Sequence, residues 1–226
     1  MSGSAAKLPS LPAPPLSIVL RLALVAAALL LLARSYAVDA VAALLPVIGA
    51  EIKALDDNIT IGALEVAGDS DRDVVRLRAN LLRPQVFEGQ MIYPLGWKPN
   101  TNGWFQVRVS ARGVLQSVLI FLAVVLAWPV YGGREFTLRA ALALPFGALL
   151  FAIDTPADLL GNFQEAVVRR IDPQATTALF TWDRFLEGGG SAALALGFAV
   201  VAIGIAARIA KPKAARIPSA PESPGT

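Results

Sequence analysis

The chain has 226 residues, 55% of them hydrophobic, and a mean hydropathy of +0.58. Soluble domains are usually about 45–50% apolar, so this composition indicates a membrane protein. The chain contains no cysteine and no histidine, which excludes disulfides, thiolate nucleophiles, cysteine zinc sites and imidazole bases. We therefore expect no cofactor and no metal. The net charge is only +3 and the basic residues are scattered, so we expect no nucleic-acid partner.

Residues 1–15 are rich in proline and small side chains, and are predicted to be a disordered cytoplasmic tail. The apolar run that follows predicts a first transmembrane helix over 16–34, because a bilayer core of about 30 Å needs roughly 20 apolar residues. A cleavable signal peptide is the alternative, since Ser35-Tyr36-Ala37 loosely fits a small-x-small cleavage site. The length of the run and the tail before it favour a retained anchor.

The segment 35–112 is predicted to be an extracytoplasmic helix followed by a β-rich domain. Val38–Leu55 has mostly helical spacing, interrupted at Pro46, and either lies on the membrane or packs beneath the domain. Three later runs alternate apolar and polar residues, around Ile59–Ala63, Val75–Ala79 and Phe105–Val109. A period of two is typical of half-buried strands. We expect three to five strands, braced by neighbouring helices because fifty residues make a marginal core.

The most distinctive part of this region is Gln85–Trp104, where aromatic residues alternate with proline and glycine. An interfacial belt or a place in the core is the commoner role for such residues. The functional alternative is a surface that docks a protein partner. Its candidate residues are Phe87, Tyr93, Trp97 and Trp104.

Three further apolar stretches predict the remaining spans. The middle stretch, Ala140–Ile153, has only 14 residues and is also compatible with a buried or re-entrant helix. The predicted order is a second helix at 113–131, a cytoplasmic loop at 132–139, a third helix at 140–157, an extracytoplasmic helical loop at 158–190, a fourth helix at 191–210 and a disordered cytoplasmic tail at 211–226.

The distribution of charge predicts the orientation. The short loop and the end of the chain from Arg208 onward carry net charges of +1 and +3, whereas 35–112 and 154–190 carry −1 and −3. Cytoplasmic loops collect lysine and arginine, so both termini are expected in the cytoplasm. Arg34 and Arg112 lie on the outer flanks and oppose this trend.

Two acidic residues, Asp154 and Asp158, follow the third stretch at helical spacing. A helix boundary is the commoner explanation for such residues. Because ionisable groups in membrane helices are costly and often functional, the alternative is a proton or cation site, with Glu165 nearby and Arg169 or Arg170 as its partner.

The whole pattern predicts an α-helical integral membrane protein with about four transmembrane helices and a small β-rich domain between helices 1 and 2. This layout, with Trp182-Asp183-Arg184 before the last helix, resembles the accessory membrane proteins found beside bacterial exosortases, of the exosortase H-associated type. Exosortases use cysteine, arginine and histidine in catalysis, so the resemblance implies a chain that assists such an enzyme.

We therefore expect a non-enzymatic accessory or scaffold protein of the bacterial inner membrane. Its partners would be the lipid bilayer and a membrane or periplasmic protein, with a second copy of itself as a further candidate. One alternative is a small transporter or proton-coupled subunit that uses Asp154 and Asp158. Another is a carboxylate-based membrane enzyme, which would need two acids in one cleft.

Overall fold

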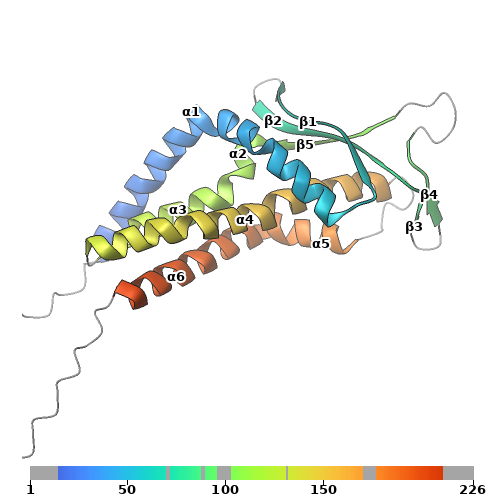
Figure 1. Cartoon of the computed structure of the whole chain (residues 1–226). Helices are drawn as coiled ribbons and strands as arrows, with labels where there is room; N and C mark the ends of the chain where they lie inside the picture. Colours follow the sequence, from blue (N-terminus) through green and yellow to red (C-terminus); the bar gives the residue numbers. More distant parts are fainter. Residues whose placement is uncertain are drawn as a thin grey trace, which may run out of the picture.

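The computed structural model describes residues 15–69, 72–87, 90–95, 103–130, 132–169 and 177–210. These residues form a mainly helical chain with a small sheet region (Figure 1). In chain order the elements are α1 (Pro15–Leu55), β1 (Ile59–Asp69), β2 (Arg72–Leu81), β3 (Gln85–Phe87), β4 (Gln90–Ile92), β5 (Phe105–Ser110), α2 (Ala111–Val114), α3 (Gln116–Ala127), α4 (Gly133–Val168), α5 (Ala178–Phe185), the π-helical turn η1 (Leu186–Gly190) and α6 (Ser191–Ala210). The two predicted disordered tails lie outside the described residues, except that Pro15 begins α1.

Three helical stretches are long and apolar enough to cross a membrane: Leu16–Leu55, Gly133–Val168 and Ala178–Ala210. They correspond to α1, to α4 and to α5 through α6. The apolar helix α3 has 12 residues, which makes it about 18 Å long. The prediction of long apolar helices that could span a membrane is therefore confirmed by length and composition.

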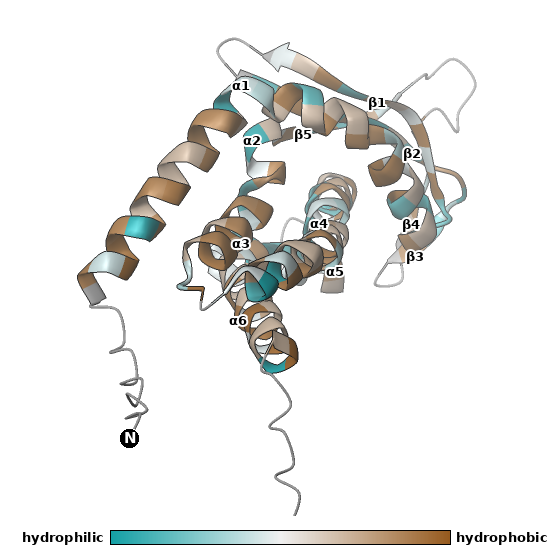
Figure 2. Cartoon of the chain, turned by 60° about the vertical axis from the view of Figure 1, so that its left-hand side comes forward, coloured by the Kyte–Doolittle hydropathy of each residue, from teal (hydrophilic) through white to brown (hydrophobic). Residues whose placement is uncertain are grey.

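The first helix, α1, consists of two halves with different surroundings. Figure 1 shows the helix bending in its middle. In the central part of its sequence, the Ser35 hydroxyl donates to the Leu31 carbonyl. A serine that bonds the carbonyl four residues earlier often bends a helix. The half before the bend is almost entirely hydrophobic and stands apart from the other helices (Figure 2). The half after it buries Val41, Ile48 and Ile52.

The sheet has the order β1-β2-β5, with both pairs antiparallel. The three alternating runs of the sequence form these three strands, so that prediction is confirmed. In β2 the alternation is regular: Val75, Leu77 and Ala79 are fully buried, whereas Arg78 is exposed. A separate hairpin, β3-β4, continues from the end of β2.

One core joins the sheet to the helices. The buried face of the sheet packs against the second half of α1 and the C-terminal part of α4, and the Phe105 and Phe163 rings meet edge to face with 5.6 Å between centroids. The amphipathic helix predicted over Val38–Leu55 is therefore the brace beneath the sheet. Pro46 does not end it.

The second core lies in a bundle of α3, α4 and α6. Its buried members are Phe121, Val125, Ala143, Leu150, Ala195, Ala199 and Ala202. The bundle is closed between α3 and α4 by Arg139, whose guanidinium donates to the carbonyls of Trp128 and Pro129, 2.9 Å away in each case, and pairs with Glu135. Arg139 is 2% exposed. This arginine, which was predicted to lie in a cytoplasmic loop, therefore stabilises the contact between the two helices.

The helix ends differ from the predicted ones. The second span, predicted at 113–131, is the short helix α3, preceded by the single turn α2. The third, predicted at 140–157, lies within the 36-residue helix α4. Asp154, Asp158 and Pro156 resemble a helix end in the sequence, but α4 continues through them because Asp154, Thr155 and Pro156 are buried by neighbouring elements.

Candidate functional site

Two of the four predicted docking residues, Tyr93 and Trp104, lie on the surface of the sheet region. Tyr93 follows β4 and Trp104 precedes β5, and their exposed fractions are 51% and 42%. Neither ring therefore belongs to the core. Phe87 ends β3, where it pairs with Gln90, but its side chain, like the whole of Trp97, lies outside the described part of the chain.

A glycine on β1 positions the ring of Trp104. A Cβ added at Gly62 would lie 2.6 Å from that ring, which no real side chain permits. The pairing of β1 with β2 shifts register between Ile61 and Ala63, so Gly62 occupies a bulge. One face of the indole thus rests on the sheet while the rest of the ring remains exposed.

Asn80, on β2, holds the two ends of the segment between the hairpin and β5. Its amide nitrogen donates to the carbonyls of Leu95 and Gly103, at 2.6 and 3.2 Å. Its amide oxygen accepts from the backbone nitrogens of Leu95 and Leu81, both at 2.9 Å. Sequence reasoning missed this residue, because an asparagine within an alternating strand gives no sign of the distant backbone it will bind.

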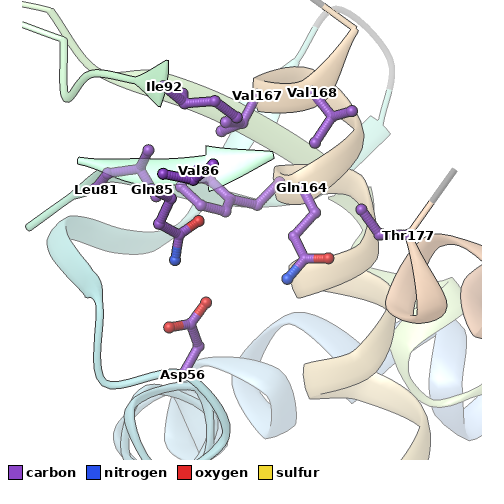
Figure 3. A pocket seen from close by; sticks show the side chains of 10 residues that line it. Asp56, Leu81, Gln85, Val86, Ile92, Gln164, Val167, Val168 and Thr177 are labelled. Carbon is purple, nitrogen blue, oxygen red and sulfur yellow. The ribbon is translucent and has the colours of Figure 1, made fainter. Parts of the chain in front are cut away.

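A pocket of about 330 Å³ lies beneath the hairpin, between β3-β4 and the C-terminal part of α4. Its apolar lining includes Leu81, Ile92, Phe163, Val167 and Val168. The polar ends of Asp56, which follows α1, Gln85 of β3 and Gln164 of α4 point toward one another (Figure 3). A mostly apolar concavity with a few convergent polar groups is the usual form of a binding site.

The surface beside this pocket is apolar as well. Val86, which lines the pocket, is 68% exposed, and its cross-strand partner Met91 is 52% exposed. Leu82 and Tyr93 on the same stretch of chain are also more than half exposed. We call these four residues, with the pocket, the hairpin surface. Clustered exposed apolar side chains commonly mark an interaction site.

The predicted acidic residues line a different cavity. Asp154 and Asp158, on α4, share a cavity of about 210 Å³ with Asp183 on α5 and Glu187 in η1. The Ser191 hydroxyl donates to Asp154 at 2.5 Å, and the Asn162 amide donates to Asp158 at 2.7 Å. The helix-boundary explanation is therefore wrong for Asp154, which is 9% exposed within α4.

Asp183 is the residue of this cavity that sequence reasoning did not assign to it. It is 2% exposed, and its Oδ1 atom has no hydrogen-bond partner among the described residues; the same is true of the Ser117 hydroxyl. Asp183 packs directly on Gly161, where an added Cβ would lie 2.5 Å from its own. In the sequence, Trp182-Asp183-Arg184 contributed to the resemblance to a family, but nothing in this segment indicated a site at Asp183.

Glu165 and Arg169 lie outside the carboxylate cavity. Arg169 pairs with Glu165 along α4, and Arg184 of α5 lies 3.8 Å from the same carboxylate. Both guanidiniums also stack near the Phe180 ring, with Arg184 at 4.9 Å from its centroid. The structure thus separates the predicted acid-and-arginine site into a cavity and a surface contact between α4 and α5.

The helices of the bundle also form the second core, in which Phe121, Leu150 and Ala195 are fully buried. Asp154 is 15 residues from Arg139, about 22 Å along α4. Among the described residues, no group of three or more acidic side chains has the geometry of a metal site. The cavity can hold water or a proton and can tie α4 to α6.

Comparison of the chain with protein-family models, with curated proteins and with solved structures found no significant match.

Proposed function

We propose that this chain is a non-enzymatic membrane protein that binds and positions another protein of the cell envelope through the hairpin surface. The observation that carries this proposal is the pocket of about 330 Å³ beneath β3-β4, flanked by exposed apolar side chains such as Val86 and Met91. A partner that inserts an apolar side chain there would bury it against Phe163 and Val167. Such buried anchors supply most of the energy of protein interfaces.

The way the hairpin surface is attached suits a positioning role. The strands, the second half of α1 and the end of α4 share one core, so a partner bound here would be held at a fixed height relative to the bundle. The resemblance to accessory proteins found beside bacterial exosortases points to the same role. We place the protein in the bacterial inner membrane, with four spans, the sheet outside and both termini in the cytoplasm.

A charge placed on the hairpin surface tests this function. Val86→Asp should reduce capture of the partner by about tenfold or more, because the carboxylate would have to be desolvated at the interface. The fold should survive, since the Val86 side chain is mostly exposed. The measurement is a gentle-detergent pull-down of the tagged full-length chain, with bound proteins quantified by mass spectrometry.

The matched control is Gly68→Asp, which adds the same charge at the far end of β1, where nothing lies within 4 Å of an added Cβ. It should capture the partner as the unaltered chain does. Equal capture by Val86→Asp, or a chain that purifies without any envelope protein, would contradict the proposed function.

The competing function is transport that uses the carboxylate cavity. It has Asp154, Asp158 and Asp183 in its favour, but the apolar core of α3, α4 and α6 separates these acids from the other end of the bundle. We therefore expect Asp158→Asn to leave partner capture unchanged within about twofold, because an asparagine keeps the shape and still accepts from Asn162. Loss of a measured proton or cation flux in this variant, with normal yield of folded protein, would instead favour transport.

A further inference from the structure

We infer that the groove between the first half of α1 and α3 binds one anionic phospholipid, with its phosphate at Arg34 and Arg112 and an acyl chain between the two helices. This site is separate from the hairpin surface and does not depend on the proposed function.

The groove has a volume of about 720 Å³ and an amphipathic lining. Its α1 wall contains Ala26, Leu29, Leu30 and Ala33, and its α3 wall contains Leu119, Ile120 and Ala123. The polar lining residues are Ser110, Arg112, Gln116 and Arg34. Figure 2 shows the hydrophobic first half of α1 standing apart from α3, α4 and α6.

The polar residues gather at one end of the groove. The first half of α1 runs toward the sheet and α3 runs back from it (Figure 1), so Arg34 lies at the same end of the groove as Arg112 of α2 and Gln116 of α3. The apolar lining continues for seven residues below them, from Ala33 to Ala26 and from Gln116 to Ala123, about 10 Å in each helix. A charged end above a hydrocarbon slot matches the shape and polarity of a phospholipid.

The charge of this end is uncompensated. Both arginines are exposed, and neither guanidinium has a hydrogen bond or ion pair with the described residues. The described residues that line the groove include no aspartate or glutamate. A guanidinium binds phosphate oxygens through paired, charge-assisted hydrogen bonds, so a lipid phosphate between the two arginines would supply the missing negative charge. Their position also explains why these two residues oppose the charge trend of the spans.

The test measures lipid retention by native mass spectrometry of the full-length protein in mild detergent, with phosphatidylglycerol and phosphatidylcholine offered in equal amounts. The unaltered protein should retain one phosphatidylglycerol in preference to phosphatidylcholine. The double variant Arg34→Gln/Arg112→Gln should lose this preference by about tenfold or more. The matched control, Arg21→Gln/Arg208→Gln, removes two exposed arginines elsewhere on α1 and α6 and should keep it.

A second variant tests the slot without touching the charges. Ala33→Trp fills the groove from the α1 wall and should also release the lipid, while gel filtration shows an unchanged folded protein. Equal retention of both lipids by the unaltered protein would overturn the inference. Full retention of phosphatidylglycerol by either groove variant would also overturn it. So would a groove without lipid in which residue 29 cross-links to a membrane helix of a partner protein.

Discussion

The close approach of α5 to α4 depends on a missing methyl group at Gly161. Asp183 packs onto this glycine so closely that an added Cβ would lie 2.5 Å from its Cβ and 2.9 Å from its Cγ. Asp183 is almost fully buried there, so it cannot rotate into solvent to make room. The glycine therefore keeps the third acid of the carboxylate cavity in place.

A methyl group added at this position should separate the two helices. We expect Gly161→Ala to lower the free energy of unfolding by about 1–3 kcal/mol, the usual cost of overpacking, and to lower the melting temperature in detergent. Gly147→Ala is the control on the same helix, because its new Cβ would make ordinary contacts of 3.8 Å with Phe121 and Val118. Alanine favours helix over glycine by about 1 kcal/mol, so the control should be neutral or stabilising. Equal loss in both variants would show that Gly161 has no special role.

The connection between α5 and α6 is an element-scale feature that depends on backbone conformation. The helices meet in η1, where Gly189 has a φ of +109°, and no other described glycine lies in the left-handed region of φ. Residues other than glycine are strained at such a positive φ. The turn orients α6 so that Ser191 reaches Asp154.

Adjacent glycines provide a matched test of this turn. Both Gly188 and Gly189 have open space around an added Cβ, but only Gly189 has the positive φ. Gly189→Ala should therefore destabilise the protein by about 1–2 kcal/mol through backbone strain, whereas Gly188→Ala should have little effect. Thermal unfolding of the two variants in the same detergent measures the difference. A difference near zero would mean that the turn relaxes without cost.

Elements were predictable from the sequence where local periodicity decides them. The alternation around Val75 and Phe105 identified the strands, because one face of the sheet is buried along its whole length. The end of α4 was not predictable, because Asp154 and Pro156 are typical stop signals unless a distant Ser191 and neighbouring helices bury them. Of the acids that line the candidate cavity, Asp154 and Asp158 were identified from the sequence, but Asp183 and Glu187 were not. Asp183 and Asn80 act through contacts with residues far away in the chain, and these contacts have no local signal.

At the scale of the whole molecule, α4 connects the two cores. Its first part contributes Ala143 and Leu150 to the bundle core, and its later part contributes Leu160 and Phe163 to the core beneath the sheet. The start of α1, the turn between α3 and α4, and the end of α6 all lie at the end of the molecule opposite the sheet (Figure 1). This arrangement fits one orientation, with the sheet on one side of a membrane and both chain ends on the other.

That orientation requires the short helix α3 to cross the membrane. At about 18 Å it is shorter than a bilayer core of about 30 Å, but a bilayer can thin locally around a short helix at modest cost. Arg139 also fixes the chain after α3 against α4, through the carbonyls of Trp128 and Pro129. The turn between these helices should therefore lie on the side opposite the sheet.

Because the chain has no cysteine, single introduced cysteines report this topology directly. Leu82→Cys, at an exposed position after β2, should react with a membrane-impermeant maleimide in intact cells. Arg134→Cys, at an exposed position near the start of α4, should react only after the membrane is permeabilised, because maleimide cannot cross the bilayer to it. Labelling of both positions in intact cells would mean that α3 does not span. The protein would then cross the membrane with its three long helical stretches alone, and the two chain ends would lie on opposite sides.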